Sequence, residues 1–500
     1  MTARLKSVPI FGEGVYAGAS IITQQRRLNC YLEVRKDKEK SSVICRGTPG
    51  LKLAFNAATP ANFPMRGMVG NNTGLYVVAS NQVKSLSATG ATLKSGSIST
   101  SIGLTGMALN PTQVMVVDGR FGYVFNPATG AVTQVGASFP NGALTICYCN
   151  GFFICESPGT NQFFVSALND GTVWNGLSFA AAVQSVDGIV AADTSGGLLI
   201  IFSSGHVEFW QNVGATPEPF QYIQNSASMF GLAAVNGRVH VGDAIFFLAR
   251  TGGASFQNQT GAVQIARIDG YSVKIVSTTD IDVILQQMAA QSTIADCTAF
   301  SYMVGSHAFA QFNFPTANRS LLLDTTTGFW SEAQSGVTQA YAARHLGNLA
   351  ASAYGQAFIA DYGNGNVYTF DPGMYTDNGS TIVRELVTRA AIEQFNTFRA
   401  SELYLDMATG VGLPTPGTQG YAPVVELSIA RNNGPFGRPR LLPLGLQGET
   451  NTRVRARRLG RARAMTLKVR MTDPVPFIIT SGAIRTSSRA GRQSGQRSAA

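Results

Sequence analysis

Histidines and carboxylates are the side chains that most often move protons in an active site, and their placement here argues against catalysis. His240 has Asp243 three residues further on, but no serine or cysteine nucleophile motif lies beside any histidine. The acids Asp280 and Asp282 could bind a cation or act as an acid–base pair, yet they precede an apolar helical pattern, where a carboxylate favours the helix N-terminus. The sequence predicts no catalytic group, cofactor or metal site, and structural roles for all four histidines, which are His206, His240, His307 and His345.

Two glycine-containing patterns resemble motifs that carry chemistry elsewhere. Gly12–Gly18 fits G-x-G-x-x-A with Glu33 about twenty residues on, but a dinucleotide site needs a βαβ unit around it, and no such pattern exists in the chain. Asp170 and Gly171 lie in a segment like the Asp-box turn of some propellers, although that motif has one residue between them. We expect an N-terminal arm and a plain hairpin turn, respectively.

Cysteines lie two apart at Cys147 and Cys149, and alternation in a strand would put both on one face. With Cys155 they could suggest a metal site, but no histidine or second cysteine pair stands at ligand spacing. We expect reduced thiols in the core.

Cations gather in residues 452–473, which hold seven arginines and one lysine. Residues 431–500 carry a net charge of +13, against −3 for residues 1–430. Such an asymmetry indicates that the basic region binds a polyanion or an acidic surface of a partner protein. The alternation with Val454 and Ala456 predicts a strand with an apolar back, broken at Leu459, and a returning strand, hence a basic hairpin. The candidate contact residues are Arg453, Arg455, Arg457, Arg458, Arg461, Arg463, Lys468 and Arg470.

A repeated β-unit must position these groups. From residue 75 the chain alternates short apolar runs with turns such as "DGRFG" and "YGNGN". The units start 39, 38, 46, 47, 64 and 49 residues apart, and periods of about 40–50 residues are typical of propeller blades. Between two units, Ile281, Ile284, Leu285 and Met288 have helical spacing and predict an inserted helix. The seven expected hairpins are Leu75–Ser87, Val114–Val135, Phe152–Trp174, Leu198–Gln211, Ile245–Val276, Phe309–Trp330 and Phe358–Phe370.

After Asp371 the pattern changes to longer alternating strands with long loops, which favours a β-sandwich. The sequence therefore predicts an all-β fold: a β-propeller of six or seven blades plus a β-sandwich platform domain. The expected domains are an N-terminal arm joining the platform (1–40), the propeller (41–375), the platform (376–486) and a disordered basic tail (487–500).

Three segments, in this order, resemble one family: "QQRRLNCYLEVRKDKEKSSVICRGTPGL", "DGIVAADTSGGLLIIFSSGHVEFWQNVGAT" and "RRLGRARAMTLKVRMTDPVPFIITSGAIR". The family is that of the tail nozzle, or packaged-DNA stabilisation, proteins of short-tailed bacteriophages (podoviruses). The resemblance implies a structural virion protein of the tail, not an enzyme, with the chain ends meeting in the platform. It also implies a homo-hexameric ring below the portal and its adaptor (the head-to-tail connector), which extends the DNA channel and retains packaged DNA until ejection. Tail needle, tailspike or fibre proteins are further implied partners.

The arginines could contact DNA in such a channel or hold protein subunits together. About eight cations per copy in a six-fold ring would slow the exit of DNA, because the affinity of the ring for DNA rises steeply with each phosphate contact. Residues 41–375 carry a net charge of −4, which suits a passage for DNA. We therefore expect subunit or adaptor contacts, with DNA contact and a solvated face as alternatives. The expected acidic partners are Glu385, Glu393, Glu402 and Asp406.

A carbohydrate-active or sugar-binding propeller is the alternative function. An enzyme of this kind would require an acid pair and an Arg or Tyr cluster at the propeller axis. A sugar-binding module would suit exposed aromatics on blade loops, whereas Trp174, Trp210 and Trp330 stand within strand runs and look like core residues. The N-terminus lacks the apolar block of a signal peptide, and no apolar run reaches the length of a membrane span. We expect a protein assembled in the host cytoplasm that does not contact a membrane.

Overall fold

The computed structural model describes residues 4–8, 10–11, 25–35, 42–58, 62–184, 188–251, 262–336, 343–392 and 396–488. The chain forms two compact units. The first contains residues 1–48, 329–332 and 381–500, and the second contains residues 49–328 and 333–380. Glu393 and the Gly12–Gly18 pattern lie outside the described residues.

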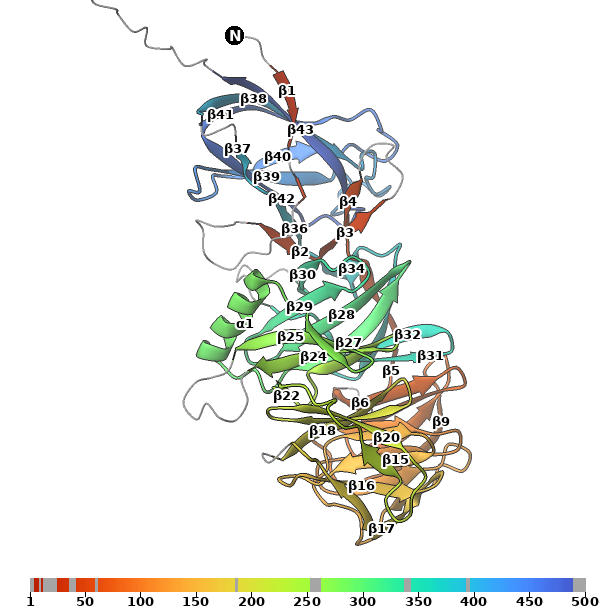
Figure 1. Ribbon diagram of the computed structural model, residues 1–500. Coiled ribbons are helices and arrows are strands. Elements are labelled where there is room, and N and C mark those ends of the chain that lie inside the picture. Colours follow the sequence, from red (N-terminus) through yellow and green to blue (C-terminus); the bar gives the residue numbers. More distant parts are fainter. Residues whose placement is uncertain are drawn as a thin grey trace, which may run out of the picture. The chain divides into compact units, whose positions relative to one another are not determined.

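The second unit is a β-propeller of seven antiparallel sheets (Figure 1). Each of the seven hairpins expected from the sequence lies in a different sheet. The first sheet contains β6 Met65–Asn71, β7 Gly74–Ala79, β8 Gln82–Leu86 and β9 Thr92–Ser97, and the second contains β10 Gly106–Leu109, β11 Val114–Val117, β12 Gly122–Phe125 and β13 Val132–Gln134. The third sheet contains β14 Ile146–Cys149, β15 Phe152–Glu156, β16 Gln162–Ala167 and β17 Asp170–Ala181. The fourth contains β18 Ile189–Ser195, β19 Leu198–Ser203, β20 Val207–Asn212 and β21 Phe220–Tyr222. The fifth sheet contains β22 Phe230–Leu232, β23 Arg238–Val241, β24 Ala244–Thr251, β25 Val263–Asp269 and β26 Ser272–Ile275. The sixth contains β27 Thr298–Val304, β28 His307–Phe314 and β29 Arg319–Asp324. The seventh contains β31 Gly347–Ala353, β32 Gln356–Asp361, β33 Asn366–Asp371 and β5 Gly50–Asn56.

The last sheet closes the ring with a strand from the other end of the unit. β5 pairs antiparallel with β33, so that Phe370 lies opposite Leu51. The neighbouring inner strands β31 and β6 are in contact, although some 280 residues separate them in the chain. The blade number, which the repeat spacing left at six or seven, is therefore seven. A short hairpin of β34 Thr376–Asp377 and β35 Ser380–Thr381 follows the last sheet.

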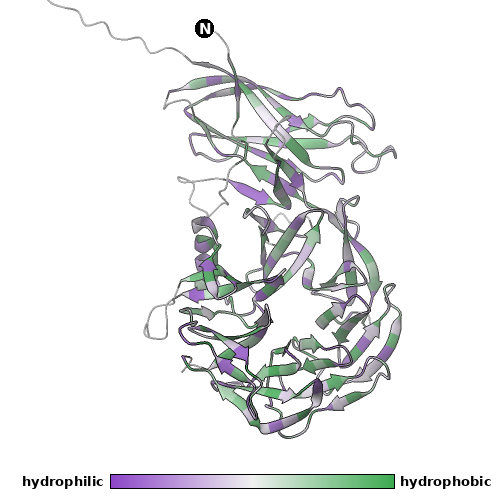
Figure 2. Ribbon diagram, turned by 45° about the vertical axis from the view of Figure 1, so that its right-hand side comes forward, coloured by the Kyte–Doolittle hydropathy of each residue, from purple (hydrophilic) through white to green (hydrophobic). Residues whose placement is uncertain are grey.

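The blades pack through apolar side chains on both faces of each sheet, and hydrophobic residues run along the strands (Figure 2). Cys147 and Cys149 share one buried cluster with Trp210, as the alternation predicted. Cys155 instead belongs to the cluster on the other side of its sheet, with Trp174. All six cysteines of the chain are buried and unbridged, which confirms the prediction of core thiols. The three tryptophans are also buried, as predicted.

The expected helix is present between the fifth and sixth sheets. It is α1, Thr279–Gln291, and its four buried residues are those with helical spacing, Ile281, Ile284, Leu285 and Met288. Asp280 and Asp282 lie in its first turn, where the helix dipole favours negative charge. In the part of the chain that the structure describes, no helix is long and apolar enough to cross a membrane.

The first unit is a β-sandwich. One layer, called sheet A here, has the order β3 Cys30–Val34, β4 Val43–Gly47, β43 Ile478–Ser488, β38 Phe398–Met407 and β41 Val454–Ala462, with β1 Arg4–Ser7 also paired to β43. The other layer, sheet B, has the order β30 Trp330–Ala333, β2 Arg26–Leu28, β36 Arg384–Val387, β42 Ala464–Met471, β39 Val424–Arg431 and β40 Arg440–Pro443, with β37 Ala391–Ile392 also paired to β42.

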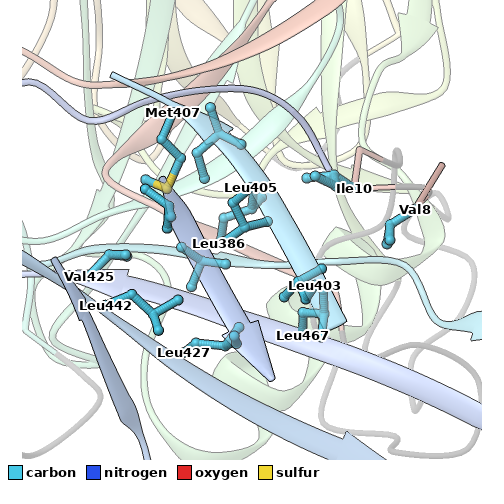
Figure 3. Packing of buried hydrophobic residues seen from close by; sticks show 14 of the residues in the cluster. Val8, Ile10, Leu386, Leu403, Leu405, Met407, Val425, Leu427, Leu442 and Leu467 are labelled. Carbon is cyan, nitrogen blue, oxygen red and sulfur yellow. The ribbon is translucent and has the colours of Figure 1, made fainter. Parts of the chain in front are cut away.

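Alternate side chains of the two sheets fill the space between them. Leu403, Leu405 and Met407 of β38 face Leu427 of β39 and Leu467 of β42 in one buried cluster (Figure 3). The N-terminal strand β1 pairs with the C-terminal strand β43, with Lys6 opposite Ile484. Both ends of the described chain therefore lie in one sheet of the sandwich.

Candidate interaction surface

The histidines do not form a catalytic group among the described residues. His307 pairs with Asp324 at 2.7 Å and is buried. His345 is also buried, and burial lowers its pKa to about 4. The acid beside His240 is not its sequence neighbour Asp243 but Asp193 of the adjacent blade, at 2.8 Å from Nε2. No three histidine, cysteine or acidic side chains lie close enough to hold a metal ion in the described part of the chain.

Asp193 forms hydrogen bonds between two neighbouring blades. It lies on β18 and accepts hydrogen bonds from Arg238 and His240 of β23. Burial alone would raise the pKa of Asp193, but the positive charges of His240 and Arg238 outweigh burial and hold it well below its usual range. The charge of Asp193 in turn raises the pKa of His240 above its ordinary value of 6.5.

The His240–Asp193 pair predicts a pH dependence of propeller stability. Since the folded state raises the pKa of His240, the pair stabilises fully below the unfolded pKa, and this contribution is lost as pH rises through the folded pKa. We expect a loss of less than about 1 kcal/mol above pH 6.5, because the histidine side chain is 44% exposed. Thermal unfolding of wild type and His240→Gln across pH 6–9 measures it. A pH slope as steep in His240→Gln as in wild type would contradict the assignment.

The remaining sequence candidates are structural. Asp282 accepts hydrogen bonds from Gln264 and from Ser277, which fixes the start of α1. Asp170 accepts hydrogen bonds from the backbone and side chain of Thr172, and the Trp174 indole donates to the Gly171 carbonyl. Asp170 and Gly171 are the first residues of β17, and the expected hairpin turn is formed by Leu168 and Asn169 directly before them.

The prediction that residues 452–473 form a hairpin is wrong, because the two strands of this segment do not pair with each other. β41 pairs with β38 in sheet A, whereas β42 pairs with β36 and β39 in sheet B. The chain crosses from one layer of the sandwich to the other at Arg463, between the two strands. Strand alternation reveals which residues share a face, but it does not reveal which strands are partners.

The predicted break at Leu459 is also wrong. β41 continues to Ala462 through a bulge, where the pairing with β38 shifts between Arg457 and Gly460. Arg458 adopts a left-handed φ of 57° there, and Leu459 is buried in the core. The extra residue restores the alternation, so that Arg461 again points outward.

Five exposed arginines lie on the outer surface of sheet A, while Val454 and Ala456 on the same strand are buried beneath. Arg457 lies opposite Glu402 in the pairing of β41 with β38, and Arg485 lies opposite the same glutamate in β43. Two acids, Glu402 and Asp406, share this surface, so it keeps an excess of positive charge. The surface is called the arginine face below; its arginines are Arg399, Arg455, Arg457, Arg461 and Arg485.

Glu402 is the centre of the arginine face. Its carboxylate lies 3.3 Å from Arg457 and 3.4 Å from Arg485, and it accepts a hydrogen bond of 2.8 Å from the Tyr404 hydroxyl. The Tyr404 hydrogen bond, followed by the charges of the surrounding arginines, holds the pKa of Glu402 below its usual value. By contrast, Arg399 lies directly opposite Arg461, a like-charge pair that disfavours the isolated sheet and favours an anionic partner.

The other predicted contact residues lie elsewhere. Lys468 and Arg470 are half-buried in sheet B: Lys468 stacks over the Phe436 ring at 4.7 Å, and Arg470 stands between Glu385 and Glu426 in the strand register. Three exposed residues stand at the margins of β41, in the bulge or beyond its ends: Arg453, Arg458 and Arg463. Sequence reasoning missed Arg399 and Arg485, whose membership depends on the long-range pairing of β38 with β41 and β43.

The acids that were expected to pair with these arginines contact different kinds of side chain within the chain. Glu402 pairs with Arg457, one of the predicted cations. Glu385 instead pairs with Arg26 at 3.5 Å, and Asp406 accepts a hydrogen bond of 2.7 Å from Thr480. Whether these acids meet arginines of another subunit stays a prediction.

Comparisons with known proteins cover both units. A family model described as bacteriophage P22 Gp10, beta-propeller, matches residues 11–375, and one described as bacteriophage P22 Gp10, beta-sandwich, matches residues 383–487. No curated protein matches. Similar solved structures include the Neurospora crassa Pan2 WD40 domain (10% identity, 64% of this chain and 96% of that one, TM-score 0.42) and the computationally designed Ika8 protein (10% identity, 69% and 100%, TM-score 0.38).

Proposed function

Because the chain belongs to the bacteriophage P22 Gp10 family, the tail nozzle or stabilisation proteins of podophages, we propose that it assembles as a hexameric ring in the phage tail. Membership makes it a structural component of the virion. In the proposal the ring lies below the portal and its adaptor, extends the DNA channel and retains packaged DNA until ejection. Assembly in the host cytoplasm and contacts with the needle, tailspike or fibre proteins belong to the same proposal.

The arginine face carries the proposed subunit or adaptor contact. Its guanidinium groups project from a sheet whose other side is fully packed, so that the backbone beneath them is fixed. Planar guanidinium groups pair bidentately with carboxylates, and a rigid row of them suits an acidic protein surface of complementary spacing. Two acids against five arginines leave most of this pairing capacity for a partner.

DNA is the weaker candidate for this face. Each phosphate that a protein neutralises makes the slope of log DNA affinity against log salt concentration more negative by about 0.9. In a ring of six copies the five arginines of each copy would together contact many phosphates, so the ring would bind DNA tightly. Such a collar would oppose rapid exit of the genome. Residues 41–375, with a net charge of −4, supply a surface that attracts phosphate less.

The test replaces Arg455 and Arg457 of the arginine face, together with the neighbouring Arg453, by alanine in the full chain. We expect loss of rings in mass photometry and negative-stain images, with an unchanged unfolding temperature, because these side chains are exposed. DNA retention per assembled ring in reconstituted particles is expected to stay as in wild type. The matched control replaces the exposed Arg438, on the loop between β39 and β40, and is expected to form rings normally. Intact rings that leak DNA would instead assign the arginines to DNA contact.

A further inference from the structure

Two surfaces of the propeller expose apolar side chains on a well-fixed backbone. The first lies at one end of the second blade, where three segments meet, which are residues 98–105, 118–121 and 135–145. The Thr100 hydroxyl donates a hydrogen bond of 2.8 Å to the Asp118 carboxylate, and the Gly119 amide donates one of 3.2 Å to the Ala143 carbonyl. This surface is called the blade-2 end below, and its exposed apolar residues are Ile102 and Leu144.

A buried arginine fixes the loop that carries Ile102. Arg66 of β6 makes five hydrogen bonds of 2.6 to 2.9 Å, which use every N–H donor of a guanidinium group. The acceptors are the Thr100 hydroxyl and the carbonyls of Ser80, Thr100, Ile102 and Gly103. The Ile102 side chain is nevertheless 80% exposed. A side chain presented on a fixed backbone loses little freedom on binding, so it suits recognition by a partner.

The second surface is the outer strand of the third blade, β17, which has 12 residues (Figure 1). Its apolar side chains Val173 and Leu177 are each more than half exposed. Residues 175–178 bulge out of the pairing with β16. The Leu177 amide donates a hydrogen bond of 3.0 Å to the Asn175 side chain, which fixes the bulge with the leucine at its tip.

Outer strands of a sheet usually carry charge or are kept short, which prevents pairing with other chains. The outer strands of the first, fifth and seventh blades carry Lys94, Lys274 and Lys52. Those of the second and fourth blades have three residues each, and β30 of the sixth sheet pairs with β2. Among the described outer strands, β17 is therefore the one that is long, unpaired and without lysine. Its bulge interrupts the edge, but a bulge does not account for exposed aliphatic side chains.

Charge distinguishes the two surfaces and indicates what each can bind. No lysine or arginine occurs between Arg120 and Arg238, and the charged residues of this stretch, which includes β17, are Glu156, Asp170, Asp187, Asp193, Glu208 and Glu218. Such a surface does not suit DNA or another polyanion. The blade-2 end has the opposite sign, since Asp118 is buried and Arg120 is exposed, over the Phe121 ring at 5.0 Å. The two surfaces are therefore complementary, each apolar and with opposite residual charge.

We propose that the two surfaces form one contact between copies of this chain, in which the blade-2 end of one copy packs on β17 of the next. Ile102 and Leu144 meet Val173 and Leu177, while Arg120 faces the acidic stretch around β17. A contact made by two different patches continues from copy to copy, as a closed ring requires. The inference rests on the proposed ring for this continuation, and it adds a second contact to the one proposed for the arginine face.

Cross-linking tests the contact, because all six native cysteines are buried and provide no exposed thiol. One chain carries Ser101→Cys and a second carries Gly176→Cys, so that Ile102 and Leu177 stay in place. The two chains are produced together and treated with a short bismaleimide. We expect at least fivefold more covalent dimer than from either variant alone. The control pairs Gly176→Cys with Ser306→Cys, an equally exposed serine on the turn between β27 and β28, and should give no more dimer than the single variants.

A second variant tests the apolar part of the contact. Ile102→Asp, added to the Ser101→Cys chain, should lower the yield of covalent dimer at least fivefold, because it places an unpaired carboxylate against an apolar and acidic surface. Met303→Asp makes a similar change at an exposed residue of β27 and is the matched control. We expect that control to leave the yield unchanged.

The remaining outcomes overturn the inference in distinguishable ways. Hexameric rings without the cross-link contradict this contact and leave the proposed ring in place. Protein that stays monomeric in mass photometry contradicts both. Equal cross-linking within Ser101→Cys alone would mean that two blade-2 ends meet each other instead. An undiminished yield with Ile102→Asp would mean that the isoleucine takes no part in the contact.

Discussion

Gly231→Ala is expected to destabilise the propeller by about 3 kcal/mol or more, since overpacking of a closed core costs 1–3 kcal/mol and lost strand contacts add to it. Gly231 lies in β22, opposite Arg250 of β24. A Cβ atom built on Gly231 would lie 1.7 Å from the backbone carbonyl oxygen of Ser204, in the turn between β19 and β20. Neither backbone can move aside without disturbing its own sheet.

The contact that would open is the one between the fourth and fifth blades. Val207 and Ser228 exchange two backbone hydrogen bonds of 3.0 and 2.9 Å beside Gly231. Phe202 and Phe247, one from each blade, stack edge to face at 5.2 Å in the core between them. Displacement of β22 would therefore weaken both the bridge and this aromatic contact.

Denaturant unfolding of the two alanine variants measures the effect. Gly176→Ala is the matched control, because a Cβ atom there would meet nothing within 4 Å and the glycine has no left-handed φ. We expect the control to unfold within about 0.5 kcal/mol of wild type. Equal stability of Gly231→Ala and Gly176→Ala would show that β22 can shift freely, contrary to the packing described.

Local pattern was sufficient to predict much of the fold. The turns with Gly, Asn and Asp located one hairpin in each blade, because a tight turn and its two strands are adjacent in sequence. The spacing of Ile281, Ile284, Leu285 and Met288 located α1 for the same reason. All-β architecture, the propeller and the sandwich follow from these signals and from the family resemblance.

Long-range pairing could not be predicted from such signals. β5 closes the last blade against β33, and Asp193 meets His240 across two blades, although nothing in the flanking residues specifies either partner. The arginine run shows the same limit: the outward positions of Arg455 and Arg457 were predicted, but the division of the run between two sheets was not. Arg399 and Arg485 joined the arginine face only through the strand order of sheet A.

Glu156→Ala is expected to cost the propeller about 2–5 kcal/mol, because each of the two buried amide donors that it leaves without an acceptor costs about 1–3 kcal/mol. The carboxylate of Glu156 is buried at the end of β15. It accepts hydrogen bonds from the Leu144 and Thr145 amides and from the Thr145 hydroxyl, and so fixes the connection that leads into β14. Thr145 in turn accepts a hydrogen bond from the Ala192 amide of the next blade, which extends the network across the blade interface.

Glu156→Gln should be milder, since the amide keeps the volume and one acceptor oxygen, and comparison of the two variants separates charge from packing. Burial raises the pKa of Glu156 even though its hydrogen bonds lower it. The folded state therefore binds the proton more readily than the unfolded state, and wild-type stability falls as pH rises above the ordinary value of 4.5. Glutamine does not titrate, so the stability gap between wild type and Glu156→Gln should narrow from pH 4 to pH 8.

Urea denaturation at several pH values tests both parts, with Asp269→Ala as the control. Asp269 is an exposed carboxylate paired with Arg267, and its removal should cost less than about 1 kcal/mol. A gap that widens with pH would mean that the ionised carboxylate is the form the fold prefers. Equal losses in Glu156→Ala and Glu156→Gln would mean that both acceptor oxygens are required. The expected order, with alanine far below glutamine, follows because only alanine leaves the Leu144 and Thr145 amides without an acceptor next to the blade interface.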